Sequence, residues 1–224
     1  TLNAATLKAR EMRKAGESAR AIEILVSGGE YFMKQPLVLT AEDSGTESSP
    51  LVIRAEKGDK AILNGGVRVE GWEIVNPKLW RAFIPQVAYN NLYFEQLYVN
   101  GERAVRARTP NEGFSKVRKV DETVLEKGTG RAPEFAVQKI GIDPADAKLI
   151  ENFSREDFRD ALIIFYHNWD NTRKRITGFS KDSSSVYTVG EGMKPWNPVN
   201  SKSRYLIENF LGALDAPGEW FLER

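Results

Sequence analysis

Short apolar runs separated by glycine-containing turns constrain the fold of this chain more than any other feature. Ile22, Ile24 and Val26 alternate with their neighbours, and Leu51–Ala55 is a second short apolar run, which is the pattern of β-strands. No segment between these runs has the pattern of a crossover helix, so a sheet built from βαβ units is excluded. Two architectures fit short strands with frequent turns: an antiparallel sandwich and a parallel β-helix.

Repetition favours the second architecture. Residues 22–40 and 51–69 form similar units of strand, glycine turn and strand, and 29 residues separate Ile24 from Ile53. Repeats of about 20–50 residues are typical of solenoids, although two copies leave the sandwich open. The segment from residue 2 to residue 12 has the spacing of an amphipathic helix, which would cover the open end of a solenoid.

The character of the sequence changes after Pro110, where a charged stretch with little periodicity begins. The strongest single strand pattern follows later, at residues 161–166. We therefore predict three parts: residues 1–110 as a cap helix with the first β-helix coils, residues 111–200 as an inserted, mainly β subdomain, and residues 201–224 as a return to the β-helix.

Composition excludes several classes of function. The chain has 224 residues with 32 basic and 31 acidic side chains, so it has no basic field for nucleic acid. No apolar run approaches the ~20 residues that a membrane-spanning helix needs. With no cysteine and one histidine, the sequence predicts neither disulfides nor a metal site, and no phosphate-binding motif indicates a cofactor. The oligomeric state stays open.

Four stretches resemble one group of proteins. They are GGEYFMKQPLVLTAEDSGTESSPLVIRAEKGDKAILNGG near the start, QLYVNGERAVRARTPN at residues 96–111, YHNWDNTRKRI, and SRYLIENFLGALDAPGEWFLER. Together they are similar to bacterial right-handed parallel β-helix repeat proteins, most of which are carbohydrate-active enzymes of the glycoside hydrolase type.

This resemblance implies an incomplete right-handed parallel β-helix made of N-terminal coils, with an N-terminal capping helix and an inserted, mainly β subdomain. It implies the N-terminal part of an exported, periplasmic or extracellular, polysaccharide-degrading enzyme, with a polysaccharide or oligosaccharide as partner. The catalytic carboxylates of related enzymes lie on later coils, so we expect them outside this chain. A polysaccharide lyase on the same scaffold and a non-catalytic glycan-binding or structural module are the alternatives.

The best candidates for glycan contact follow the strongest strand. An indole can stack on a sugar ring while polar side chains hydrogen-bond its hydroxyl groups. The stretch contains His167, Trp169, Asp170 and Arg173, and Trp196 stands in a later loop stiffened by two prolines. The alternative interpretation is a strand-end turn held by its own side chains, with Trp196 filling a gap.

Two further candidates are Arg106 and Arg108, which alternate with apolar residues and would lie on one face of a strand. Two guanidinium groups on one face could bind a carboxylate or sulfate of an acidic glycan. They could equally form ion pairs with acidic side chains of the chain itself, such as Glu95 or Glu102.

One carboxylate pair, Asp215 and Glu219, lies across a Pro-Gly turn. Glycoside hydrolysis needs two carboxylates about 5–9 Å apart, a distance that sequence spacing across a turn cannot establish. The resemblance implies that this element is architectural.

Overall fold

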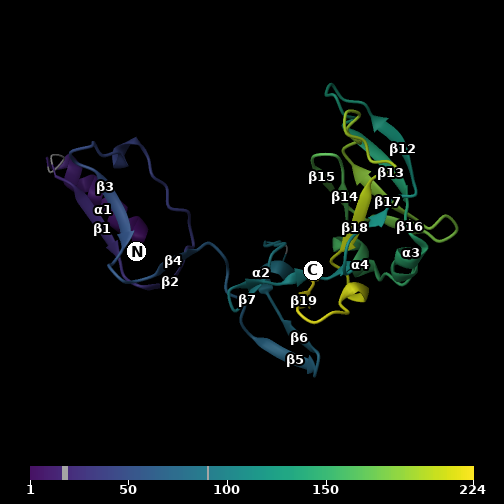
Figure 1. Cartoon of the computed structure of the whole chain (residues 1–224), viewed down its shortest axis with the longest axis horizontal. Coiled ribbons are helices and arrows are strands. Elements are labelled where there is room, and N and C mark those ends of the chain that lie inside the picture. The colour runs from purple at the N-terminus through teal and green to yellow at the C-terminus, as the bar shows by residue number, and fades with distance from the viewer. Residues whose placement is uncertain (17–19, 90) are drawn as a thin grey trace. The chain divides into compact units, whose positions relative to one another are not determined.

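The computed structural model describes residues 1–16, 20–89 and 91–224 (Figure 1). It contains two compact units, Thr1–Phe83 and Ile84–Arg224, here called unit 1 and unit 2. Each unit is described by itself.

Unit 1 consists of one helix and short strands. Strand β1 pairs in parallel with β3, and β2 pairs in parallel with β4, whereas β5 and β6 form an antiparallel hairpin. The elements are α1 (Leu2–Lys14), β1 (Ile22–Val26), β2 (Gly29–Phe32), a 3-10 helix (Ala41–Asp43), β3 (Leu51–Ala55), β4 (Ala61–Asn64), β5 (Trp72–Asn76) and β6 (Leu79–Ala82). Ile24 lies opposite Ile53, so the 29-residue repeat predicted from sequence is confirmed for this strand pair.

The prediction of a right-handed parallel β-helix is wrong. The strands of the described residues lie in seven separate sheets, five of them two-stranded, and the two largest sheets are antiparallel. In unit 1 each parallel sheet stops after two strands. The chain then turns at Asn76, whose side chain accepts a hydrogen bond from the backbone of Lys78, and returns as a hairpin instead of adding a parallel strand.

Helix α1 confirms the helical prediction for the first segment. Its N-terminal cap is Thr1, whose hydroxyl accepts a hydrogen bond from the backbone N–H of Ala4 at 3.2 Å. Arg10 joins the helix to the rest of unit 1, because its side chain donates two hydrogen bonds of 2.6 Å to the carboxylate of Asp43. This bidentate pair is the strongest polar link between the helix and the segment that follows β2.

Unit 2 contains the two largest sheets. The sheet strands and helices are α2 (Pro85–Ala88), β7 (Tyr98–Val99), β8 (Glu102–Arg103), β9 (Val105–Arg106), β10 (Arg108–Thr109), β11 (Ser115–Lys116), β12 (Lys119–Glu126), β13 (Phe135–Gly141), α3 (Pro144–Ile150), α4 (Arg155–Asp160), β14 (Leu162–Tyr166), β15 (Asn171–Arg175), β16 (Gly178–Ser180), β17 (Ser185–Gly190), β18 (Arg204–Glu208), a 3-10 helix (Leu211–Ala213) and β19 (Glu219–Trp220). One sheet has the order β12-β13-β17-β16. The other has the order β10-β18-β14-β15, with β11 also paired to β18 (Figure 1).

The two sheets share one apolar core. Ile163, Phe165 and Tyr205 from one sheet are buried in the same cluster as Ile140 and Val186 from the other. Helix α3 closes this cluster with its buried apolar side chains. The strand predicted at residues 161–166 is therefore confirmed, and its burial explains why it lacks polar residues.

Side chains at their first residues cap two helices of unit 2. Asp143 caps α3 ahead of Pro144, and Ser154 and Asp157 form a capping box at the start of α4. Strand β15 ends at Arg175, and β16 begins at Gly178.

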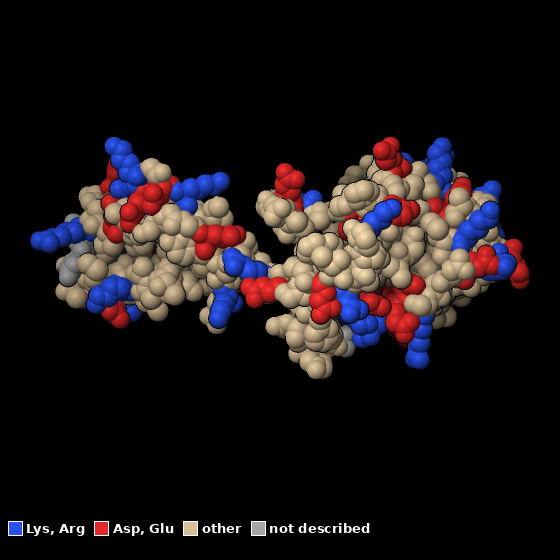
Figure 2. Space-filling model, turned by 90° about the horizontal axis from the view of Figure 1, so that it is seen from below, with Lys and Arg blue, Asp and Glu red and all other residues tan. Residues whose placement is uncertain are grey.

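Charge is evenly spread over the chain. Lys and Arg side chains are interspersed with Asp and Glu on the face seen in Figure 2, in keeping with a formal charge of +1. None of the helices in the described part of the chain has the length and apolar character needed to span a bilayer.

The pair between Arg10 and Asp43 predicts a pH dependence of stability. The hydrogen bonds from Arg10, followed by that from the backbone of Thr40, lower the pKa of Asp43 to about 2. Since an unfolded aspartate has a pKa of about 3.9, the stabilisation is present above about pH 4 and is lost as the pH falls towards 2. Asp43→Asn should therefore lower the thermal unfolding temperature at pH 7 but have little effect near pH 2, measured by far-UV circular dichroism.

Glu42→Gln is the matched control, because Glu42 pairs with Lys14 while both side chains are more than half exposed. We expect it to change the unfolding temperature little at either pH. An Asp43→Asn variant as stable as the parent at pH 7 would contradict the assignment.

Candidate functional site

The turn between β14 and β15 carries the most exposed of the predicted site residues. Tyr166 pairs with Asn171 as the last register pair, and the backbone N–H of His167 donates to the carbonyl oxygen of Asp170 at 3.0 Å. This closes a tight turn over residues 167–170. Trp169 stands at its tip with 66% of its surface exposed, so one indole face is available to solvent.

The carboxylate of Asp170 is fixed by a loop that is distant in sequence. Lys194 donates to Oδ2, and Asn197 donates from Nδ2 to Oδ1 at 2.6 Å. The hydrogen bond from Lys194 is the main cause that lowers the pKa of Asp170, with contributions from the charges of Lys194 and His167. Asp170 is therefore ionised at neutral pH and holds the turn against the loop at residues 194–197.

Two buried polar atoms beside this carboxylate keep hydrogen-bonding capacity. Nε2 of His167 lies 2.9 Å from the hydroxyl of Thr172. In the described part of the chain, however, Nδ1 of His167 and Oδ1 of Asn197 have no hydrogen-bond partner. Both atoms are closed to solvent, and a buried polar atom without a partner costs about 1–3 kcal/mol.

Trp196 lies in the same loop, between the two residues that bind Asp170. Its surface is 40% exposed, and the guanidinium of Arg131 lies 4.3 Å from its ring centre. A cation over an aromatic face is attracted by the ring electrons, so this contact restricts the indole. The structure therefore brings His167, Trp169 and Asp170 together in one turn and joins that turn to the loop containing Trp196.

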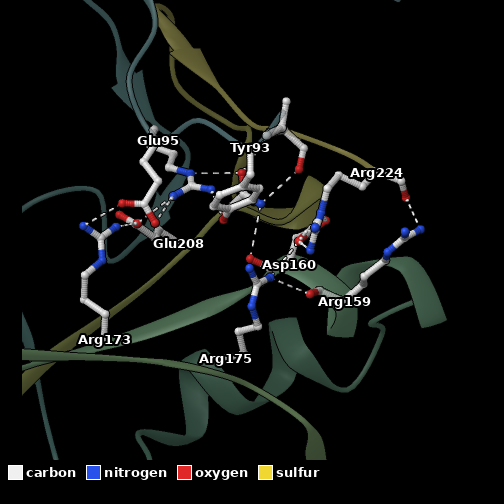
Figure 3. A network of polar contacts seen from close by, with 11 residues as sticks. Tyr93, Glu95, Arg159, Asp160, Arg173, Arg175, Glu208 and Arg224 are labelled. Carbon is white, nitrogen blue, oxygen red and sulfur yellow. Dashed lines mark hydrogen bonds and ion pairs between the residues drawn. The ribbon is translucent and has the colours of Figure 1, made fainter. Parts of the chain in front are cut away.

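Arg106 and Arg173 belong to a second cluster, shown close up in Figure 3. Arg106 is 7% exposed and donates to Glu208, to Oδ1 of Asn209 and to the hydroxyl of Tyr93, over 2.8–3.1 Å. Arg173 bridges Glu95 at 3.1 Å and Glu208 at 2.6 Å. Both guanidinium groups are thus paired with acids of the chain.

Asp160 extends this cluster towards the last residues of the chain. Its buried carboxylate accepts hydrogen bonds from Arg175 at 2.7 Å and from Nε of Arg224 at 2.8 and 2.9 Å. The guanidinium carbons of Arg175 and Arg224 lie 5.1 and 4.9 Å from the ring centre of Tyr93 (Figure 3). The arrangement joins β15, α4 and the segment after β19 through one charged network.

Asn209 connects the same network to the backbone. Its amide nitrogen donates to the carbonyl oxygens of Asp160 and Leu222, and Oδ1 accepts from Arg106 and from the backbone of Leu222. Its backbone is left-handed, with φ 68°, a conformation that asparagine tolerates better than most residues. The second cluster is therefore saturated with internal partners.

Arg108 has different partners from Arg106. It donates to the carbonyl oxygens of Pro110 and Gly113 and lies over the ring of Phe114, 5.8 Å from its centre. The two arginines expected on one face thus serve two separate sets of contacts. Glu219 of the predicted carboxylate pair accepts from the backbone N–H groups of Asp215 and Ala216, which fixes the local turn.

Comparisons with known proteins identify the family of this domain. Residues 77–224 match the GH141 insertion domain. The chain belongs to this family. A solved structure named glycoside hydrolase superposes with a TM-score of 0.73 and 28% identity over 99% of this chain and 37% of that chain. No curated protein matches the sequence.

The insertion domain is thus related to glycoside hydrolases, as the sequence resemblance implied. These comparisons support the glycoside hydrolase part of that resemblance and not the parallel β-helix repeat. The chain spans 37% of the length of the solved relative. Among the described residues, no group of three or more His, Cys, Asp or Glu side chains could hold a metal ion.

Sequence reasoning missed several residues that the structure places at the turn or beside it. Lys194 and Asn197 bind Asp170, and Arg204 lies opposite Tyr166 in the neighbouring strand. The sequence signal for the loop was present, since Trp196 was predicted there. The partner of that loop could not be read from local spacing.

The charged network around Asp160 predicts a large effect on stability. Asp160→Asn removes the carboxylate that Arg175 and Arg224 share and leaves both cations without it. Removing one partner of a fully buried ion pair costs about 3–5 kcal/mol, and the partial exposure of both arginines reduces the expected loss of unfolding free energy to about 2 kcal/mol. Urea unfolding measures it.

Asp182→Asn provides the control, because Asp182 is exposed in the turn between β16 and β17. We expect its unfolding free energy to stay within about 0.5 kcal/mol of the parent. Equal stability of the two variants would show that the network does not hold the end of the chain.

Proposed function

We propose that the insertion domain binds carbohydrate for a glycoside hydrolase, through the turn at residues 167–170. The observation that carries this proposal is the exposed indole of Trp169 next to a fixed, ionised Asp170. An exposed indole on a rigid turn offers an apolar platform of the size of a sugar ring. The adjoining polar groups offer hydrogen bonds to hydroxyl groups on the rim of that ring.

The polar part of the proposed site is held before any ligand arrives. Asp170 cannot swing freely, because Lys194 and Asn197 hold both of its oxygens. Prearranged groups lose less conformational entropy on binding, which favours affinity for a flexible oligosaccharide.

Trp196 is a second aromatic surface in this proposal. It is held by Arg131 and lies in the loop that binds Asp170. Two aromatic residues presented by joined elements would contact successive sugars of one chain. Arg173 and Arg106 contribute by holding the sheet that carries the turn, since their guanidinium groups bind Glu95 and Glu208.

Hydrolysis itself is proposed for the whole protein and not for these residues. The family match and the solved relative support a glycoside hydrolase, and the relative is much longer than this chain. We place the catalytic carboxylates outside these 224 residues. A polymeric substrate cannot enter a cell intact, so we also propose that the protein acts in the periplasm or outside the cell.

The exposed indole gives the direct test of carbohydrate binding. The 224-residue chain is titrated with neutral xylo-, cello- and galacto-oligosaccharides and with an acidic oligogalacturonate by isothermal calorimetry. We expect Trp169→Ala to weaken binding of the best ligand at least tenfold, because an aromatic platform at the centre of a site contributes about 2 kcal/mol or more.

Trp80→Ala serves as the matched control, since Trp80 is an exposed tryptophan of unit 1. It should leave the affinity within twofold of the parent. The proposal fails if none of the acidic or neutral oligosaccharides binds the parent chain, or if both tryptophan variants bind as the parent does.

A further inference from the structure

A row of side chains crosses the five-stranded sheet, and two of its members flank the turn that carries Trp169. Cross-strand partners in an antiparallel sheet point to the same face. Lys116 lies opposite Arg204, Arg204 opposite Tyr166, and Tyr166 opposite Asn171. We call these four residues the strand-end row.

The strand-end row lies on the face opposite the shared core. Tyr205 and Phe165, the next residues along β18 and β14, are fully buried in that core. Arg204, Lys116 and Asn171 are exposed, and Tyr166 is half-buried. The row therefore presents two cations, a phenol and an amide to solvent.

The two cations of the row differ from the other arginines of this sheet. Arg173 and Arg175 are bound to acidic side chains, and Arg108 donates to two backbone carbonyl oxygens. In the part of the chain that the structure describes, the side chains of Arg204 and Lys116 form no hydrogen bond and no ion pair. Their charges are thus available to a ligand.

Aromatic rings fix the position of Arg204. Its guanidinium carbon lies 4.7 Å from the ring centre of Phe114. The Phe114 ring packs in turn against Tyr166, with 4.7 Å between the ring centres. A guanidinium held against an aromatic face keeps its donors directed outward and loses little freedom when it binds an anion.

The row and the proposed carbohydrate site adjoin each other in the same hairpin. Tyr166 and Asn171 are the last register pair of β14 and β15, and the turn between them contains His167, Trp169 and Asp170. A sugar packed against Phe114 or Tyr166, the rings that lie beside Arg204, would have its substituents near both cations, because Lys116 lies opposite Arg204.

We propose that Arg204 and Lys116 bind the anionic group, a carboxylate or a sulfate, of an acidic oligosaccharide. This inference rests on the proposed function and specifies its substrate class. The planar guanidinium of Arg204 can donate two parallel hydrogen bonds to two oxygens of a carboxylate or sulfate, and Lys116 adds a second positive charge beside it. Asn171 and the Tyr166 hydroxyl offer hydrogen bonds to neighbouring hydroxyl groups.

The test compares three oligosaccharides of equal length with the 224-residue chain. The probes are an oligogalacturonate, a sulfated galacto-oligosaccharide and a neutral galacto-oligosaccharide, titrated by isothermal calorimetry at 50 and 500 mM salt. We expect at least one acidic probe to bind tenfold more tightly than the neutral one at low salt. The tighter acidic probe identifies whether the group is a carboxylate or a sulfate, and high salt should reduce the preference.

Variants then test whether the strand-end row causes the preference for the acidic probe. R204Q should weaken binding of the acidic probe about tenfold and binding of the neutral probe less than twofold. K116Q should weaken binding of the acidic probe by a smaller factor. R204K should retain part of the preference, because it keeps the charge but loses the planar fork. K127Q is the matched control, since it removes one exposed charge from the connection after β12.

The outcomes separate this inference from the proposed function. Equal binding of acidic and neutral probes that still depends on Trp169 overturns the acidic substrate class and leaves carbohydrate binding in place. An acidic preference that K127Q reduces as much as R204Q also overturns the assignment, because it would reflect net charge alone. If no probe binds, both proposals fail.

Discussion

Strand β14 is hydrogen-bonded along both edges, to β15 on one side and to β18 on the other. Its side chains alternate between the shared core, which receives Ile163 and Phe165, and the opposite face, where Tyr166 lies. Since the side-chain period of a strand is two, a slip of one residue would exchange these faces. A slip of β18 by one residue would turn Tyr205 out of the core and Arg204 into it, so the burial of Tyr205 fixes the register that sets Arg204 beside Tyr166.

Local features of this structure could be predicted from sequence. The amphipathic first helix and the apolar strand at residues 162–166 each depend on side chains within a few positions of one another. The turn after that strand was also predicted as the site, because polar and aromatic residues gather there. The contacts that complete it were not, since Asp170 meets Asn197 across 27 residues and Arg106 meets Glu208 across 102.

The architecture was predicted wrongly for a related reason. The 29-residue spacing identified one parallel strand pair, Ile24 opposite Ile53, but a pair does not determine how many strands follow. The reversal at Asn76 and the antiparallel pairing of the larger sheets depend on contacts that no repeat encodes. Among the described residues of unit 1, the fully buried apolar side chains are Ala9 and Ile22, so polar links such as Arg10 to Asp43 have unusual weight there.

Two requirements meet at Asn209: a left-handed backbone and four hydrogen bonds of its side chain. Glycine would accept the backbone angle but form none of the four bonds, and aspartate would keep the acceptor but lose both donations to carbonyl oxygens. Alanine and glutamine meet neither requirement. As the family diverges, this position therefore has almost no room to drift, whereas the exposed Trp169 at the tip of its turn can change without disturbing the scaffold.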